Sequence, residues 1–300
     1  KKYVIVNSSL THNNKRDETM TKHITKPSDG AIKPRRMQFN TDDMNMAQFA
    51  IENNSLISTF FYTLSGMFPD GERFFIHSVR HYQKTISDPK MIADIRGFIG
   101  QEAHHGRCHE DLNDEIEKLG IPIKMVSNNM ASRIEMLKRR FGPARQLALT
   151  VAMEHFTASL AEFILDNPEV LDQAPETFRQ MMLWHSVEEI EHKAVAFDVF
   201  RLQVDNEWMR RRVMVIAMVS LFSRIALFQI RMLWKTKHLP SWQEWRGAFQ
   251  FFWGKKGILR ANAHGMKKFF QRGFHPNDID QSALIEAWEE RFPDVAAQEA

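Results

Sequence analysis

The sequence predicts an all-α protein, a four-helix bundle with additional helices at its C-terminal end. Long stretches with helical apolar spacing are joined by short connections, which is typical of antiparallel bundles. The 300 residues include only 13 Gly and 11 Pro, and no run of alternating β-branched residues indicates a strand. An apolar content of 43% and a charged content of 26% are ordinary for a globular protein.

Residues 1–40 are expected to form a disordered basic tail, because they carry nine Lys or Arg, three Asp or Glu and no apolar periodicity. The rest of the chain is mildly acidic, so the net charge of +3 does not indicate nucleic-acid binding, and we expect no nucleic-acid partner. The sequence shows no signal-peptide pattern, and Cys108 is its single cysteine. We therefore expect a cytoplasmic location.

The bundle itself is expected to span residues 41–206. Acceptor side chains at 41–43 predict the N-terminal cap of a first helix that runs into Phe60. The stretch 68–71, Phe-Pro-Asp-Gly, predicts a break, and Glu72 then opens a second helical run.

Three helical segments of more than 20 residues follow, at 88–119, 128–165 and about 175–204. Pro89 in the first turn is a strong start signal for the first of them. A bend is expected in the second at Gly142-Pro143. Their lengths and short connections favour an antiparallel arrangement.

Residues 207–300 are expected to pack on the bundle within the same domain. The stretch 213–233 is mostly apolar, but Arg224 and Arg231 are seven residues apart and share one helical face. Each arginine near the centre of a bilayer costs about 2.5–3.5 kcal/mol, which disfavours a membrane span. We therefore expect a bundle helix or a dimer face, and a homodimer that covers the apolar patch.

An aromatic block follows at 239–257, with three Trp and three Phe. It is compatible with a lid over an apolar pocket, a partner interface, or a helix lying on a membrane surface. Peripheral membrane contact through 207–272 is therefore one expectation. A last amphipathic helix is predicted around 277–291.

Two Glu-x-x-His pairs carry the chemistry that the sequence suggests. Glu102 and His105 lie in the segment 88–119, and Glu189 and His192 lie in the segment 175–204. Helical bundles use such pairs to hold a carboxylate-bridged pair of metal ions. One pair alone is weak support, but two pairs on antiparallel helices can face each other.

Such a site also needs one carboxylate from each of two further helices. Glu72 precedes the first pair, and Glu154 lies between the pairs among alanines and methionines. Buried carboxylates without partners are costly, and two divalent ions would balance four of them. Hard oxygen ligands with imidazole suit iron, manganese or zinc and not copper. The sequence therefore predicts a site of two metal ions with six ligands: Glu72, Glu102, His105, Glu154, Glu189 and His192.

Several neighbouring residues have open roles. His109 and His185 lie one helical turn from predicted ligands, on the same faces. Each is compatible with a third imidazole ligand, with a hydrogen-bond partner of a ligand, or with a core histidine. Three acidic residues are candidates to orient His192 through its other ring nitrogen: Glu188, Glu191 and Asp198. Glu188 is also a possible additional metal ligand.

The ligand order resembles that of the ferritin-like di-iron carboxylate superfamily. Four motifs also resemble a bacterial family of predicted metal-dependent hydrolases: PRRMQF at 34–39, FPDGERFF at 68–75, FIGQEAHHGRCH at 98–109 and WHSVEEIEHKAVAFDVF at 184–200. This likeness covers about 40–275. The superfamily implies a ferritin-like four-helix bundle and oxygen chemistry, whereas the narrower family implies hydrolysis.

The leading hypothesis is a di-iron enzyme that uses O2 to oxidise an apolar or amphipathic small molecule. In this reading no protein residue beyond the metal ligands is catalytic. One alternative is a metal-dependent hydrolase with a metal-bound hydroxide at the same site. Another is a non-enzymatic, membrane-associated helical protein that binds metal.

Overall fold

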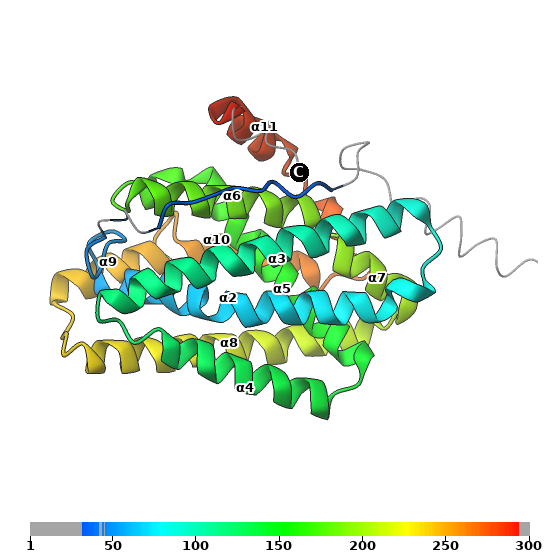
Figure 1. Cartoon of the computed structure of the whole chain (residues 1–300), viewed down its shortest axis with the longest axis horizontal. Helices are drawn as coiled ribbons and strands as arrows, with labels where there is room; N and C mark the ends of the chain where they lie inside the picture. Colours follow the sequence, from blue (N-terminus) through cyan, green and yellow to red (C-terminus); the bar gives the residue numbers. More distant parts are fainter. Residues whose placement is uncertain (1–31, 42–43, 45, 294–300) are drawn as a thin grey trace, which may run out of the picture. The chain divides into compact units, whose positions relative to one another are not determined.

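The computed structural model describes residues 32–41, 44 and 46–293, which belong to one compact unit and contain no β-strand. This confirms the predicted all-α class. Figure 1 shows the main helices, which are α2 (Ser55–Tyr82), α3 (Pro89–Lys118), α4 (Lys124–Arg140), α5 (Pro143–Asp166), α6 (Glu176–His192), α7 (Val195–Gln203), α8 (Glu207–Lys235), α9 (Trp242–Trp253), α10 (Ile258–Phe269) and α11 (Ser282–Arg291).

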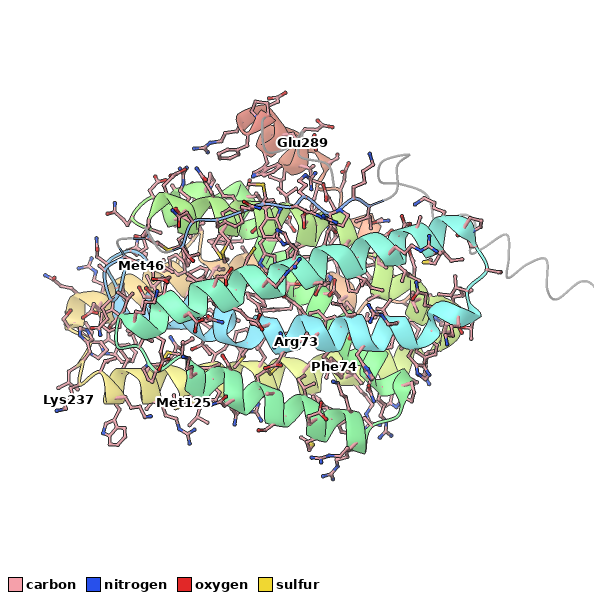
Figure 2. All side chains as sticks on the ribbon, viewed as in Figure 1. Met46, Arg73, Phe74, Met125, Lys237 and Glu289 are labelled. Atoms are coloured by element: carbon pink, nitrogen blue, oxygen red, sulfur yellow. The ribbon has the colours of Figure 1, made fainter. Side chains whose placement is uncertain are left out.

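Four helices position the predicted ligands. α2 packs against α3 and α5, and α6 packs against the same two helices. α4 and α8 both pack against α2, and α8 also packs against α5. Figure 2 shows the side chains on the helices. The buried apolar ones form two clusters between the helices. The ligand-bearing faces are thereby held inside the bundle.

The first helix begins later than predicted. α2 starts at Ser55, and the side chain of Asn54 caps it by accepting a hydrogen bond from Leu56 N at 3.0 Å. Glu52 and Asn53 adopt positive φ angles of 55° and 46°, so the chain turns sharply before the helix. Of the predicted caps, residues 42 and 43 lie outside the described residues.

Pro69 lies inside α2, so the break predicted around it is wrong. A proline in a helix lacks the N–H that would bond the carbonyl four residues earlier, here that of Ser65. Asn113 of α3 donates its Nδ2 to this carbonyl at 3.0 Å. The helix therefore continues, and Glu72 lies in its interior instead of at a helix start.

Two further boundaries differ from the prediction. The segment predicted at 128–165 is two helices, of which α4 begins at Lys124 and α5 begins after the expected interruption at Pro143. The segment predicted at 175–204 is also two helices, α6 and α7. Lys193 lies between them and donates its Nζ to the carbonyl of Ile279 at 2.6 Å.

α8 lies against the bundle with one face buried and the other exposed. The buried side chains recur every three or four residues and are Met214, Ala217, Leu221, Ile225, Phe228 and Met232. Two described helices, α5 and α8, are long and apolar enough to cross a membrane. Within the most apolar 18-residue stretch of each helix, 83% of the stretch in α5 is buried, whereas only 28% of the stretch in α8 is buried.

Residues 32–41 lie extended along α6 (Figure 1). A Cβ on Gly97 of α3 would lie 2.2 Å from the carbonyl oxygen of Ile32, so only glycine permits this approach. His104 of α3 bonds the carbonyl of Met37 at 2.7 Å. Of the tail expected at 1–40, residues 1–31 lie outside the described residues.

Candidate metal centre

The structure brings the six predicted ligands together inside the bundle. Each is buried, and they come from α2, α3, α5 and α6. His109 and His185 are buried beside them. We call these eight residues the carboxylate–histidine cluster: Glu72, Glu102, His105, His109, Glu154, His185, Glu189 and His192.

One end of the cluster is centred on His192. Its Nε2 lies 3.1 Å from Glu102 Oε1, 3.4 Å from Glu154 Oε2 and 3.6 Å from Glu189 Oε2. Three carboxylates from three helices thus converge on one ring nitrogen. The ligand atoms of Glu102, Glu189 and His192 all lie within 4.8 Å of one another, close enough to share a metal ion.

The other end is formed by His105 and His185. His105 Nδ1 lies 4.0 Å from Glu102 Oε1 and 3.9 Å from Glu189 Oε1. His185 Nε2 lies 2.9 Å from Glu189 Oε1 and 3.9 Å from Glu72 Oε1. Glu102 and Glu189 therefore lie between the two ends, where a carboxylate can bridge two ions.

Most of the inward-facing polar atoms have no hydrogen-bond partner. Both carboxylate oxygens of Glu72, Glu102 and Glu154 are buried without one, and so are one oxygen of Glu189 and the inner ring nitrogens of His105 and His192. The contact of 3.1 Å between Glu102 and His192 lacks hydrogen-bond geometry. So many unsatisfied acceptors are costly in a folded protein, and divalent cations would satisfy them. The donor set fits such ions.

The pKa values reflect this crowding of charge. Burial, followed by the charge of Glu102, raises the pKa of Glu72 and of Glu154 well above the usual value. Burial also raises the pKa of Glu102 to about 7. Burial acts in the same direction on Glu189, but the hydrogen bond with His185 and the nearby ring of His192 outweigh it and lower its pKa.

The histidines differ from one another. Burial lowers the pKa values of His105 and His109 well below the usual value, and the neighbouring His185 lowers them further. Burial also disfavours the charged form of His192, but the carboxylates of Glu102 and Glu154 outweigh burial and raise its pKa. The pKa of His192 is thus shifted in the opposite direction to those of His105 and His109, because carboxylates surround its ring.

Glu188 orients His105 from outside the cluster. Its Oε2 lies 3.0 Å from His105 Nε2, which turns Nδ1 of the same ring inward. The Oε1 of Glu188 accepts a hydrogen bond from the backbone N–H of Arg35 at 2.9 Å. Arg35 in turn donates to both oxygens of Glu191 at 2.8 and 2.6 Å. The extended segment 32–41 therefore supports the centre from its rim.

His192 is oriented by an amide, and none of the three predicted acids contacts its outer ring nitrogen. Gln101 Oε1 lies 2.9 Å from His192 Nδ1, and the Nε2 of Gln101 donates to Glu191 at 2.9 Å. Glu188 instead contacts His105, and Asp198 lies 2.7 Å from His275. The prediction that an acidic residue orients His192 is therefore wrong, because Gln101 does so.

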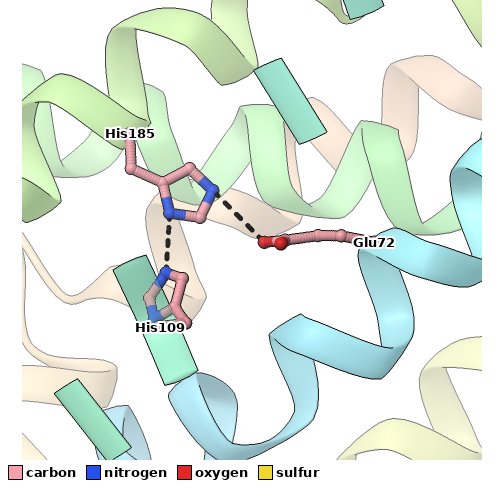
Figure 3. Close-up of side chains that lie close together, drawn as sticks. All are labelled: Glu72, His109 and His185. Atoms are coloured by element: carbon pink, nitrogen blue, oxygen red, sulfur yellow. Dashed lines mark hydrogen bonds and ion pairs between the residues drawn. The ribbon is translucent and has the colours of Figure 1, made fainter. Parts of the chain in front are cut away.

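A hydrogen-bond chain fixes the tautomer of His109. Asn113 Nδ2 donates to the Ser65 carbonyl, so Asn113 Oδ1 accepts the Ser65 hydroxyl hydrogen at 2.7 Å. Ser65 Oγ must then accept from His109 Nδ1, 2.9 Å away. The Nε2 of neutral His109 is therefore an acceptor, and His185 Nδ1 donates to it at 2.8 Å (Figure 3).

This chain determines what His185 presents to the centre. Because its Nδ1 carries the hydrogen, the Nε2 of a neutral His185 points a lone pair toward Glu72 (Figure 3). The same nitrogen lies 2.9 Å from Glu189 Oε1. A lone pair and a carboxylate at 2.9 Å repel each other unless a proton or a cation lies between them. His185 Nε2 is therefore available to a cation, while His109 holds the other side of the ring.

Gly106 provides space for Glu72. A Cβ at Gly106 of α3 would lie 3.0 Å from Glu72 Oε2 and 3.7 Å from Pro69 Cα. This separation is tighter than ordinary van der Waals contact, so a larger residue would push the carboxylate away. An alanine at this position would therefore require the Glu72 carboxylate to shift by a few tenths of an ångström.

Sequence reasoning missed the residues that orient the ligands. They are Arg35, Ser65, Gln101 and Asn113. Two signals could have pointed to some of them. Arg35 lies in the motif PRRMQF, and a helix that continues through Pro69 requires an outside donor for the carbonyl of Ser65.

We expect Arg35→Met to weaken metal binding by about 10–100-fold, the effect typical of partners that orient metal ligands. The substitution removes the Arg35 guanidinium that pairs with Glu191. The negative charge of Glu191 is then uncompensated beside Glu188. A competition titration against a chelator measures the affinity. Arg36→Met, an exposed change one residue away, is the control and should leave the affinity unchanged. Equal affinities in both variants would contradict the role of Arg35.

The family model described as "Predicted metal-dependent hydrolase" matches residues 33–280 of the chain. The match includes all eight residues of the carboxylate–histidine cluster. The comparisons with curated proteins and with solved structures found no match.

Proposed function

We propose, from the premise that the chain belongs to the family of predicted metal-dependent hydrolases, that it is a hydrolase with two metal ions in the carboxylate–histidine cluster. The observation that carries this proposal is the set of buried carboxylate oxygens without hydrogen-bond partners on Glu72, Glu102 and Glu154. Four buried carboxylates from four helices are balanced by two divalent ions. The helical arrangement is the one that holds metal pairs in other bundles.

The proposed ligands divide between two positions. His192 would serve one position with Glu154, and His105 would serve the other with Glu72, while Glu102 and Glu189 lie between them. His185 joins the second position as a third imidazole, because its Nε2 points there. Bound there, the ions would supply Lewis-acid polarisation of the bond to be cleaved and a water molecule of lowered pKa.

The chain's own residues orient the ligands and keep the centre dry. Glu188 and Gln101 fix the ring orientations of His105 and His192. Trp184 covers His105, with the two ring centroids 4.9 Å apart, and is itself buried. Phe68 covers His109 and His185 with centroid distances of 4.7 and 5.2 Å. Exclusion of bulk water strengthens the electrostatic interactions inside the centre.

O2-dependent oxidation is the second candidate function. A Glu from each of two helices with a Glu-x-x-His pair from each of two others is the ligand set of ferritin-like di-iron proteins. The positions of Glu72, Glu154 and the two pairs on α2, α5, α3 and α6 favour this alternative. The family membership reverses the preference that the sequence suggested and places hydrolysis first.

Metal analysis together with an O2-controlled assay tests the proposal. Protein produced in medium containing both iron and zinc is analysed for metal per chain, and ester hydrolysis is measured with and without O2. About two ions per chain and turnover without O2 support the hydrolase. Turnover only with O2 and iron would favour oxidation. Less than one ion per chain would contradict a metal pair.

We expect metal binding at pH 7 to release protons. The pKa values of Glu72, Glu154 and His192 are raised well above the usual values, so the metal-free protein holds protons there that coordination must displace. The metal affinity is therefore greatest above these raised pKa values. It falls as the pH decreases through them and through the pKa of Glu102, which is about 7.

Calorimetric titration in two buffers with different ionisation enthalpies measures this release. The observed binding heat should differ between the buffers at the same pH. Equal heats in both buffers would show that the ligands are already deprotonated, contrary to the prediction.

A further inference from the structure

A cavity of about 710 Å³ lies between α2, α4, α5 and α8, beside the metal centre. Phe68, which lines this cavity, also contacts the rings of His109 and His185. Met153 and Gly71, also in the lining, directly neighbour the proposed ligands Glu154 and Glu72 along α5 and α2. The volume lies within the range of small-molecule sites, about 300–1,000 Å³. Phe68 therefore lies between the cavity and the imidazoles of His109 and His185.

The cavity wall is apolar and also cationic. Arg133 of α4 and Arg224 of α8 line it, and both are half-buried. Arg133 donates to Ser220 at 2.8 Å and Arg224 donates to Asn129 at 2.6 Å, both neutral acceptors. Burial and then the charge of Arg224 lower the pKa of Arg133, as expected for two close guanidinium groups.

No acidic residue compensates these charges within the described lining. Three further arginines line the cavity at exposed positions, Arg140, Arg145 and Arg212. Half-buried arginines without a carboxylate are costly unless an anion pairs with them. A long apolar wall beside such a pair matches a molecule with an apolar chain and one anionic group.

We propose that this cavity binds a linear acyl chain bearing a carboxylate or phosphate, which Arg133 and Arg224 hold while the chain lies along the apolar wall. The substrate class of the proposed hydrolase would then be acyl esters or amides with an anionic group. This assignment rests on the proposed function. In the reaction the acyl carbon–heteroatom bond breaks, the hydroxyl of water goes to the acyl carbon, and the proton goes to the leaving heteroatom.

Binding to the metal-loaded full chain tests the inference independently of turnover. Palmitate, hexadecyl phosphate and uncharged hexadecanol are titrated by displacement of a fluorescent fatty acid. We expect the two anions to bind at least tenfold more tightly than the alcohol. The stronger binder of the two anions identifies the anionic group. Equal binding of all three would overturn the role of the arginines.

Variants locate the site. The double variant Arg133→Met, Arg224→Met should lose at least tenfold in affinity for the anions and keep its affinity for hexadecanol, which also reports an intact fold. Arg139→Met, an exposed change on α4 outside the cavity lining, is the control and should behave as the wild type. Absence of anion binding with two metal ions still present would reject this inference and leave the proposed hydrolase standing. If neither anion binding nor two metal ions were found, this inference and the proposed hydrolase would both be rejected.

A separate observation concerns the outer surface of α8 and α9. We call it the aromatic face and define it by exposed apolar side chains on these helices: Trp208, Val215, Ile216, Val219, Ile230, Trp234, Trp242, Trp245, Phe249 and Trp253. Trp234 is 77% exposed and Trp242 is 80% exposed, which is far from the usual burial of tryptophan. On α8, the residues Trp208, Val215, Ile216, Val219, Ile230 and Trp234 recur at helical spacing on one exposed side, which indicates an interaction surface.

The segment of the chain that carries this face is strongly basic. Residues 207–272 contain fourteen Lys or Arg against two Asp or Glu, a net charge of about +12. Tryptophan combined with basic residues on a surface helix is typical of proteins that lie on anionic membranes. The buried face of α8 packs on α5 and α2, so the helix lies on the bundle and presents only its outer face.

We infer that the aromatic face docks on the surface of an anionic lipid bilayer. Trp208 and Ile216 belong both to this face and to the lining of the cavity, so the cavity opens where the bilayer would lie. A second copy of the chain is the competing occupant, since a homodimer would also cover the apolar area.

Sedimentation with lipid vesicles distinguishes the two occupants. The protein should bind vesicles of phosphatidylglycerol at least tenfold more tightly than vesicles of phosphatidylcholine, and high salt should weaken the binding. The double variant Trp234→Ala, Trp245→Ala should lose this binding, whereas Leu202→Ala, an exposed change outside the face, should retain it. If the protein bound no vesicles but formed a dimer that the double variant dissociates, the bilayer proposal would be wrong. A second copy of the chain would then be the partner that covers this face.

Discussion

Replacing Glu154 by glutamine is expected to abolish the metal pair and turnover while the fold is retained. Glu154 is the single carboxylate that α5 contributes to the cluster, and the amide keeps its size but removes the anionic donor. We expect metal content to fall from about two ions per chain to at most one, and activity to fall more than about 100-fold, beyond the loss typical of residues that only orient ligands.

Stability separates this effect from unfolding. Burial and neighbouring charges raise the pKa of Glu154, which favours the neutral carboxyl group in the metal-free protein, and an amide is neutral as well. The metal-free variant should therefore match the metal-free wild type within about 1 kcal/mol in denaturant unfolding. Glu162→Gln on the same helix is the control and should keep both metal ions. Full metal loading of the Glu154 variant would reject this ligand.

Replacing Trp184 by alanine is expected to cause the largest loss of stability of any change considered. This side chain is 1% exposed and contacts the rings of Phe39, His104 and His105. Truncating a buried tryptophan costs about 3–5 kcal/mol through lost burial and the cavity that remains. Denaturant unfolding should show this loss, and the metal affinity should fall as well because His105 loses its cover.

Trp234→Ala provides the matched control. It removes the same atoms from a side chain that is 77% exposed, so the free energy of unfolding should change by no more than about 0.5 kcal/mol. Similar losses in the two variants would show that Trp184 contributes no more than a surface residue, contrary to its buried contacts.

The sequence allowed a correct prediction of the helical class because helical spacing and start signals are local. The Glu-x-x-His pairs at Glu102 and Glu189 also depend on local spacing, and the structure brings both together. The uninterrupted α2 was not predictable in this way. Its continuation through Pro69 depends on an amide from Asn113, which lies 48 residues away from the accepting Ser65.

The residues that orient the ligands were hidden for the same reason. Gln101 looked like an ordinary helical residue, and its contact with His192 spans 91 positions in the chain. Arg35 was assigned to a tail by composition, although its contacts with Glu188 and Glu191 place it at the centre. Likewise, Arg133 and Arg224 become a pair only when α4 and α8 both pack on α2.

The extended segment at 32–41 has a practical consequence for anyone who shortens this protein. Composition alone suggests trimming the chain at residue 41, which would delete the backbone N–H and the guanidinium that Arg35 gives to Glu188 and Glu191. It would also uncover His104 and the glycine surface of α3 at Gly97. Proteolysis within this segment is therefore expected to cause loss of bound metal. A shortened protein should begin before residue 32.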